Sequence, residues 1–149
     1  DSKSLEEWEK IITDTFAESV AAHQIADVEV GCFLSSGVDS SFVVNEVAKG
    51  TPHVKSFSVG YAEEKYSELP YAQEFSKEIG VPSIANKVDA EQFFEANRLI
   101  QWYLDEPMPN PAEVPLYFLA QNARKYVKVV LSGEGADELP GGSLYGLRA

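Results

Sequence analysis

The sequence predicts an α/β fold in three layers, with a parallel sheet covered by helices on both faces. Two observations carry this prediction. Apolar segments of strand length alternate along the chain with amphipathic segments of helix length, as is typical of βαβ units. Glycine-rich loops follow two of the predicted strands, and ligands of such sheets bind at the carboxyl ends of the strands.

The first predicted element is a helix from Ser4 to about His23. Its apolar residues recur every three or four positions, Ser4 stands at the N-cap, and two glutamates occupy the positively polarised first turn. Because the pattern is amphipathic, we expect the apolar face of this helix to pack on another apolar surface.

A βαβ unit of about 30 residues follows. The pattern predicts a strand at 28–34, a helix at about 40–49 and a strand at 54–59. Gly50 comes directly after the predicted helix and is expected to end it.

The same alternation continues to the end of the chain. A helix is predicted at about 67–79, with Pro70 tolerated in its first turn and Gly80 ending it, before a strand near 83–88. Asp89 is predicted to cap the next helix. After the proline-rich segment DEPMPNPAEVP, we expect a helix through Tyr117 and Leu119, and then a strand that leads into the second glycine loop, KVVLSGEGADE.

Composition limits the classes of partner. The 149 residues suit one domain, and a net charge of −12 disfavours nucleic acids and anionic membranes. The chain has no apolar run near the roughly 20 residues that span a bilayer, and its acidic, amphipathic N-terminus is unlike a secretory signal, so we expect a cytoplasmic location. Cys32 is expected to be a buried, inert thiol, and His23 and His53 to be ordinary histidines.

The first glycine loop, Ser35 to Ser40, reads SSGVDS. At the start of a helix its successive N–H groups suit a di- or triphosphate, the Ser35 and Ser40 hydroxyls can donate to phosphate oxygens, and Gly37 allows close approach. Asp39 would repel phosphate unless a cation lies between them, which favours Mg²⁺. The alternative is that this segment makes only a turn and a helix cap.

This loop is similar to the SGGxDS pyrophosphate loop of the ATP pyrophosphatase superfamily, in place of the Walker or GxGxxG patterns, which the chain lacks. The resemblance implies a Rossmann-like, adenine nucleotide alpha hydrolase-like fold. It also implies an enzyme that cleaves ATP to AMP and pyrophosphate. Ser36 replaces the first glycine of the pattern, and a left-handed backbone there would cost serine about 1 kcal/mol or more.

The second glycine loop, residues 132–142, reads SGEGADELPGG and resembles the SGEGxDExFGGY segment of glutamine-dependent asparagine synthetases. Two carboxylates, Glu134 and Asp137, follow the strand end closely and need a metal ion or a proton beside a phosphate. Alternatively, Asp137 and Glu138 only cap the next helix. Pro140 and Ser143 replace the phenylalanine and tyrosine of the family pattern, which leaves the packing after the loop open.

The resemblance implies roles for individual residues. Asp39 and Asp137 would hold Mg²⁺ on the pyrophosphate, and the backbone of Leu34 and Val59 would contact adenine. Glu134 would support formation of an aminoacyl adenylate; β-lactam synthetases carry tyrosine there. The residues expected to bind the nucleotide are Leu34, Ser35, Ser36, Gly37, Asp39, Ser40, Val59, Ser132 and Gly133.

The activity implied is asparagine synthesis from aspartate and ammonia. ATP would activate the side-chain carboxylate of aspartate as β-aspartyl-AMP, and ammonia would displace AMP. In the family, an N-terminal glutaminase domain with an initial cysteine supplies the ammonia, and the synthetase domain continues through a helical region. The chain begins with Asp1, so we expect residues 1–149 to be a single ATP pyrophosphatase domain, without the glutaminase domain and truncated at its C-terminus. A homodimer is left open.

Two rival functions remain at this point. One keeps the adenylation and changes the acceptor, to a β-lactam precursor or another carboxylate. The other is a module or fragment that binds ATP or AMP without turnover. The carboxylate on which pyrophosphate release depends distinguishes the first rival from asparagine synthesis. Nucleotide binding without turnover, even with saturating substrates, would indicate the second.

Overall fold

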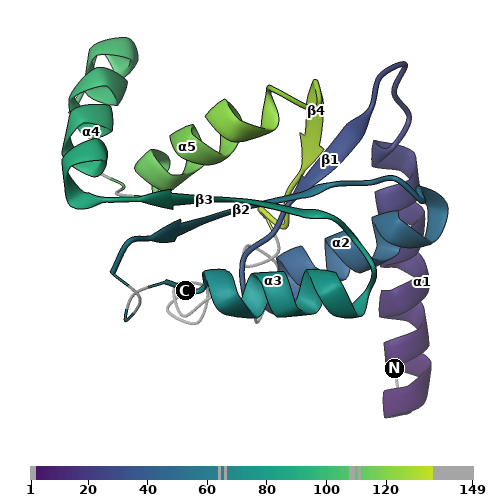
Figure 1. Cartoon of the computed structure of the whole chain (residues 1–149). Coiled ribbons are helices and arrows are strands. Elements are labelled where there is room, and N and C mark those ends of the chain that lie inside the picture. Colours follow the sequence, from purple (N-terminus) through teal and green to yellow (C-terminus); the bar gives the residue numbers. More distant parts are fainter. Residues whose placement is uncertain (1–2, 64, 66, 108–109, 111, 136–149) are drawn as a thin grey trace.

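A computed structural model describes residues 3–63, 65, 67–107, 110 and 112–135 of the chain (Figure 1). The helices are α1 (Leu5–His23), α2 (Val38–Gly50), α3 (Leu69–Glu78), α4 (Ala90–Leu104) and α5 (Glu113–Ala123). The strands are β1 (Val30–Phe33), β2 (Ser56–Tyr61), β3 (Ser83–Val88) and β4 (Val129–Leu131).

The four strands form one parallel sheet in the order β3-β2-β1-β4. Cys32 of β1 lies opposite Ser56 of β2 on one side and Leu131 of β4 on the other. From β1 the chain adds β2 and β3 on one side and then returns to place β4 on the other side. This order confirms the predicted parallel α/β sheet.

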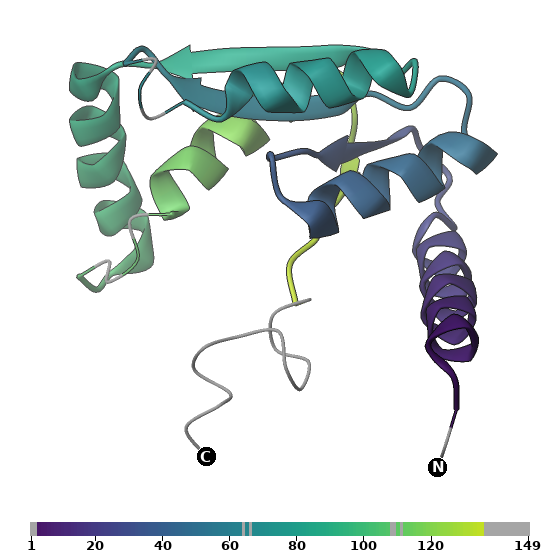
Figure 2. The same ribbon diagram turned by 90° about the horizontal axis from the view of Figure 1, so that it is seen from below.

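Helices cover both faces of the sheet, as predicted (Figures 1 and 2). Helices α2 and α3 lie on one face and α5 on the other, while α1 packs on α2 and α4 on α5. The main core, between the sheet and α2 and α3, consists of Val20, Cys32, Leu34, Val43, Val44, Val47, Val54, Ala72 and Val81. On the α5 face, Phe57 is completely buried and packs with Ala123 and Val127.

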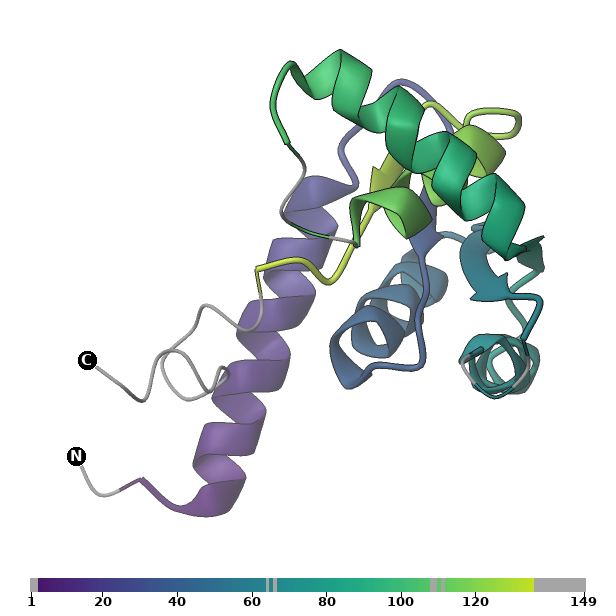
Figure 3. The ribbon, with the colours of Figure 1, turned by 90° about the vertical axis from the view of Figure 1, so that its left-hand side faces the viewer.

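Helix α1 begins as predicted, but only its second half packs against the domain. Ser4 caps it through a reciprocal capping box with Glu7, and the Phe16 ring lies 4.5 Å from that of Phe42 in α2. Leu5 and Ile12 remain 75% and 61% exposed. The first turns extend beyond α2 (Figure 3), so the apolar side chains of this half stay exposed in the described part of the chain.

Several boundaries differ from their predicted positions. Strand β2 continues to Tyr61 because its ladder with β3 continues to the pair Tyr61 and Val88. Helix α2 begins at Val38 rather than Ser40 and includes Gly50, with Thr51 as its C-cap. Other predicted signals are confirmed: Asp89 caps α4, Pro70 lies in the first turn of α3, and Gly80 has a φ of 71° after α3.

Cys32 lies in the centre of the sheet with no exposed surface. Burial raises the pKa of its thiol to about 12, so the thiol stays protonated at neutral pH, as expected of an inert cysteine. His23 and His53 are exposed. In the described part of the chain, every helix is too short or too polar to cross a bilayer.

Candidate functional site

The strand order determines where the two glycine loops lie. It reverses between β1 and β4, and in open parallel sheets the ligand crevice lies at the carboxyl ends of the strands on either side of such a reversal. The first glycine loop follows β1 and the second follows β4. Two segments almost 100 residues apart therefore meet at one edge of the sheet, as their placement after strands had indicated.

The two loops touch through Gly133. A Cβ atom at this position would lie 2.8 Å from the Ser40 nitrogen and 3.0 Å from the Asp39 carbonyl carbon. Both distances are to backbone atoms, which cannot rotate away as a side chain can. The second glycine loop therefore packs directly on the first turn of α2, and glycine is required for this approach.

Hydrogen bonds within the first glycine loop hold its shape. The Ser40 hydroxyl oxygen lies 3.1 Å from the Gly37 carbonyl oxygen, to which it can donate. The same oxygen lies 3.1 Å from the Ser35 nitrogen, whose N–H it accepts. It also lies 2.8 Å from the Ser35 hydroxyl, which accepts from the Gly37 N–H at 3.1 Å. Either hydroxyl can be the donor in that pair, so both hydroxyls already have hydrogen-bond partners within the loop. A phosphate contact through these hydroxyls requires exchange of these bonds.

The N-terminus of α2 presents donors that no side chain caps. The N-cap is Gly37, which has extended backbone and carries no capping group. The N–H groups of the first helical turn have no acceptor within their own helix, and the helix dipole makes this end positive. Asp39 lies in that turn with an exposed side chain. The arrangement suits an anion together with a hard cation that oxygen ligands can hold.

Of the predicted adenine contacts, Leu34 comes directly after β1 and Val59 lies in the neighbouring strand β2. Leu34 is buried; its N–H donates to the Phe57 carbonyl at 2.9 Å, and its carbonyl accepts from the buried Ser58 hydroxyl at 2.8 Å. The Leu34 carbonyl oxygen has a second lone pair, which can accept one further hydrogen bond. Val59 is half-buried against the cluster of Val88, Ala96, Val114 and Phe118. The sheet thus brings both positions beside the first glycine loop.

The second glycine loop is described as far as Gly135. Ser132 and Glu134 are exposed, and the Glu134 N–H donates to the Ser132 hydroxyl at 3.4 Å. Asp137, the second predicted metal ligand, and Pro140 and Ser143, the two departures from the family pattern, lie outside the described residues. Within the described ones, no three histidine, cysteine or acidic side chains form a group that could hold a metal ion.

One residue at this edge was missed from the sequence. Glu68 precedes α3, and its carboxylate accepts a hydrogen bond of 2.6 Å from the Ser36 hydroxyl. The signal was present: Glu68 lies between a strand and a helix of a parallel sheet, and such connections share an edge with the first glycine loop. Ser36 itself has no left-handed backbone, because Asp105 is the only non-glycine residue with positive φ among those described. Serine therefore causes no such strain in the loop.

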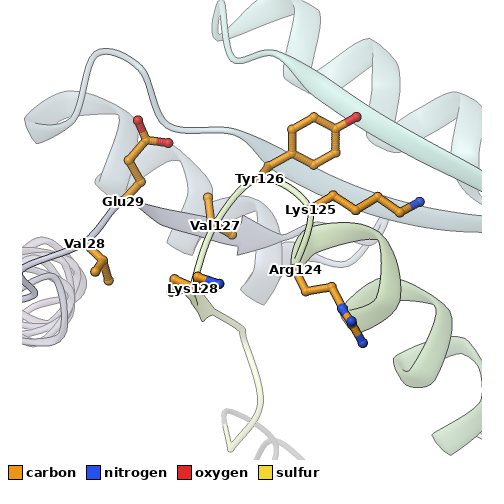
Figure 4. A pocket seen from close by; sticks show the side chains of 7 residues that line it. All are labelled: Val28, Glu29, Arg124, Lys125, Tyr126, Val127 and Lys128. Carbon is orange, nitrogen blue, oxygen red and sulfur yellow. The ribbon is translucent and has the colours of Figure 1, made fainter.

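Two hollows lie among the described residues, one at each edge of the sheet. One, of about 360 Å³, lies at the carboxyl ends of β2 and β3 against the start of α4 and is lined mainly by Tyr61, Val88, Phe93 and Phe94. The other, of about 290 Å³, lies at the opposite edge of the sheet between the starts of β1 and β4 (Figure 4). Its lining is Val28, Glu29, Arg124, Lys125, Tyr126, Val127 and Lys128.

Known proteins share this fold. An NMN synthetase of Francisella tularensis superposes with a TM-score of 0.57 at 13% identity, covering 92% of this chain and 57% of that one. An NH3-dependent NAD synthetase of Campylobacter jejuni gives a TM-score of 0.60 at 13% identity, covering 89% and 59%. At such identity the likeness concerns the fold alone, and it agrees with the predicted Rossmann-like, adenine nucleotide alpha hydrolase-like fold.

Sequence relatives are more specific. Asparagine synthetase [glutamine-hydrolyzing] 1 of Bacillus subtilis is 43% identical over 133 residues, which are 89% of this chain and 21% of that protein. A putative asparagine synthetase [glutamine-hydrolyzing] of Mycobacterium tuberculosis is 49% identical over 131 residues, 88% of this chain and 20% of that one. The chain thus spans about a fifth of the length of these relatives. The asparagine synthase family model matches residues 12–149, and the chain belongs to this family.

Proposed function

We propose that this chain forms the ATP-activating part of an asparagine synthetase and makes β-aspartyl-AMP and pyrophosphate from aspartate and ATP. The observation that carries the proposal is the contact of Gly133 with Asp39 and Ser40. It unites the two loops that resemble family motifs into one surface at the reversal of strand order. Membership of the asparagine synthase family and the names of the relatives support this function over other adenylating reactions.

The chain's own contribution to the first step is electrostatic. N–H groups at the start of α2 would bind the departing pyrophosphate, whose charge grows as the bond to the α-phosphorus breaks. The backbone of Leu34 and Val59 would orient adenine, and Ser132 and Gly133 would contact the nucleotide. Binding of this kind holds the α-phosphorus in line with the attacking carboxylate of aspartate.

Asp39 is the described residue that fits a Mg²⁺ ligand. Its carboxylate is exposed beside the N–H groups of the first turn, so a bound triphosphate and Asp39 would repel each other without a cation between them. Mg²⁺ prefers one or two carboxylates together with phosphate oxygens and would neutralise charge on the departing group. We propose Asp137 as the second ligand.

The second step replaces AMP by ammonia. The nitrogen lone pair attacks the activated carbonyl carbon, the bond to the AMP oxygen breaks, and a proton lost from nitrogen leaves asparagine and AMP. We propose that Glu134, exposed on the turn after Gly133, supports formation of the adenylate. The relatives are named glutamine-hydrolyzing, so we further propose a glutaminase domain as the ammonia source.

The proposal is tested by the exchange of labelled pyrophosphate into ATP, with Mg²⁺ and with or without L-aspartate. We expect exchange that depends on aspartate, and Glu134→Gln should slow it by at least about tenfold while Mg·ATP affinity stays within about twofold. Exchange that requires another carboxylate would indicate a different synthetase. ATP binding without any exchange would instead indicate a nucleotide-binding module.

A further inference from the structure

We propose that Glu68 is a positioning residue for the first glycine loop and acts through the Ser36 hydroxyl. This inference rests on the proposed function, because it concerns the loop that would bind the triphosphate. The hydrogen bond of 2.6 Å from Ser36 to Glu68 joins residues 32 positions apart. That distance is typical of a hydroxyl that donates to a carboxylate, and both residues are exposed.

The bond supports the part of the loop that its internal hydrogen bonds leave free. Ser35, Gly37 and Ser40 are tied to one another, as described above. The side chain of Ser36 makes its hydrogen bond outside this network, to Glu68 at the N-cap of α3. Without that bond, the loop would be held only through β1, α2 and the contact with Gly133.

Glu68 is well placed for this role because it serves no capping function in its own helix. It stands at the N-cap of α3, yet its side chain accepts no hydrogen bond from that helix. Its carbonyl instead accepts the N–H groups of Tyr71 and Ala72, which fixes the backbone from which the carboxylate extends. Removal of the carboxylate therefore releases the loop and leaves the hydrogen bonds that start α3 in place.

The bond also gives a function to the departure from the family pattern. A glycine at position 36 has no hydroxyl to donate, whereas serine gains the contact with Glu68 and pays no left-handed backbone penalty. We infer that serine at this position and glutamate at 68 act as a pair. The donated proton also lowers the repulsion that an exposed carboxylate would exert on a nearby phosphate.

The experiment compares Kd values for Mg·ATP and AMP by calorimetry in the 149-residue chain, with thermal unfolding as a check that each variant folds. We expect Ser36→Ala and Glu68→Ala each to weaken Mg·ATP by about tenfold and AMP by less than about twofold, as the loss of one charge-assisted hydrogen bond predicts. The double variant should lose no more than either single variant. Glu68→Gln keeps an acceptor and should restore affinity to within about threefold.

The matched control is Glu74→Ala, which removes an exposed carboxylate from the same helix and should leave both affinities unchanged. Equal losses for the two nucleotides, additive losses in the double variant, or failure of Glu68→Gln to restore binding would each overturn the role of Glu68. If the unaltered chain failed to bind Mg·ATP, the proposed function itself would be wrong.

Discussion

The two edges of the sheet differ in how they carry positive charge. At the amino edge, Arg124, Lys125 and Lys128 surround a hollow of about 290 Å³ that Glu29 shares. At the carboxyl edge, the described parts of the glycine loops, SSGVDS and SGEG, contain two carboxylates and no basic residue. Side-chain charge alone would therefore place an anion site at the amino edge.

At the proposed site, the geometry of the donors matters more for anion binding than the number of charged side chains. Figure 4 shows Arg124 and Lys125 extending away from Glu29, so these cations do not converge on one point. At the other edge, the N–H groups of α2 point in one direction because the helix fixes them. Fixed dipoles need no reorganisation when an anion binds, whereas long basic side chains lose conformational freedom.

The largest expected effect comes from separating the two loops at the carboxyl edge. Gly133→Val would place its side chain against the backbone of Asp39 and Ser40, which has no room for a Cβ. We expect Mg·ATP affinity to fall by about 100-fold or more. Calorimetry measures the loss, and Gly50→Ala is the control, because a Cβ at Gly50 would meet only the Gln24 side chain at 3.9 Å. Retained affinity in Gly133→Val would contradict the contact.

Next in size is the removal of charge from Asp39. If Asp39 holds a cation on the departing pyrophosphate, Asp39→Asn should weaken Mg·ATP by about tenfold and AMP by no more than about twofold. Parallel titrations with both nucleotides check this, and Asp89→Asn at the cap of α4 serves as a matched substitution outside the loops. Equal weakening of both nucleotides would remove the metal role from Asp39.

A smaller effect concerns β1, which runs between the two edges. Burial in the folded chain raises the Cys32 pKa from its ordinary value of 9.0 to about 12. The stability that the buried thiol contributes is therefore fully present below the lower pKa. It is lost as pH rises from there towards about 12, because only the unfolded chain releases the proton over this range. We expect urea unfolding at about pH 10 to show a loss of roughly 1–2 kcal/mol relative to pH 8.

Other groups titrate at high pH too, so Cys32→Ala provides the reference for this measurement. The variant should start from lower stability, since Cys32 is completely buried, but its decline with pH should be shallower. Parallel curves for the two proteins would show that the thiol already titrates normally in the folded chain.

The smallest effect is expected at the amino edge. Lys125→Gln combined with Lys128→Gln removes two cations around the hollow there, and Mg·ATP affinity should change by less than about twofold at physiological ionic strength. A salt titration distinguishes long-range attraction from direct contact. A tenfold loss of Mg·ATP affinity that persists at high salt would show that the nucleotide binds at the amino edge, contrary to our proposal.

The sequence predicted the architecture because hydrophobic periodicity and end signals agree along most of the chain. Ser4, Asp89 and Gly80 mark helix ends in the structure as their residue types indicated. The end of β2 at Tyr61 was not predictable in the same way, since its last pairs depend on β3. The exposed start of α1 was also missed, because an apolar stripe does not reveal how far its neighbour extends.

The candidate site, too, was predictable from the sequence only in part. Loop composition indicated an anion site at a helix start, and the parallel pattern placed both loops at strand ends. The contact of Gly133 with α2 required the strand order, which local periodicity does not specify. The bond from Ser36 to Glu68 required side-chain directions across two separate connections, so only the structure reveals it.

The most direct test of the central claim is an amide NMR titration of the ¹⁵N-labelled chain with Mg·ATP. We expect the amide signals of Ser36 to Ser40 and of Gly133 to shift together, with a shared affinity, while those of residues 125–128 stay in place. Shifts concentrated at 125–128, with the two glycine loops unchanged, would contradict this expectation and move the nucleotide to the amino edge of the sheet.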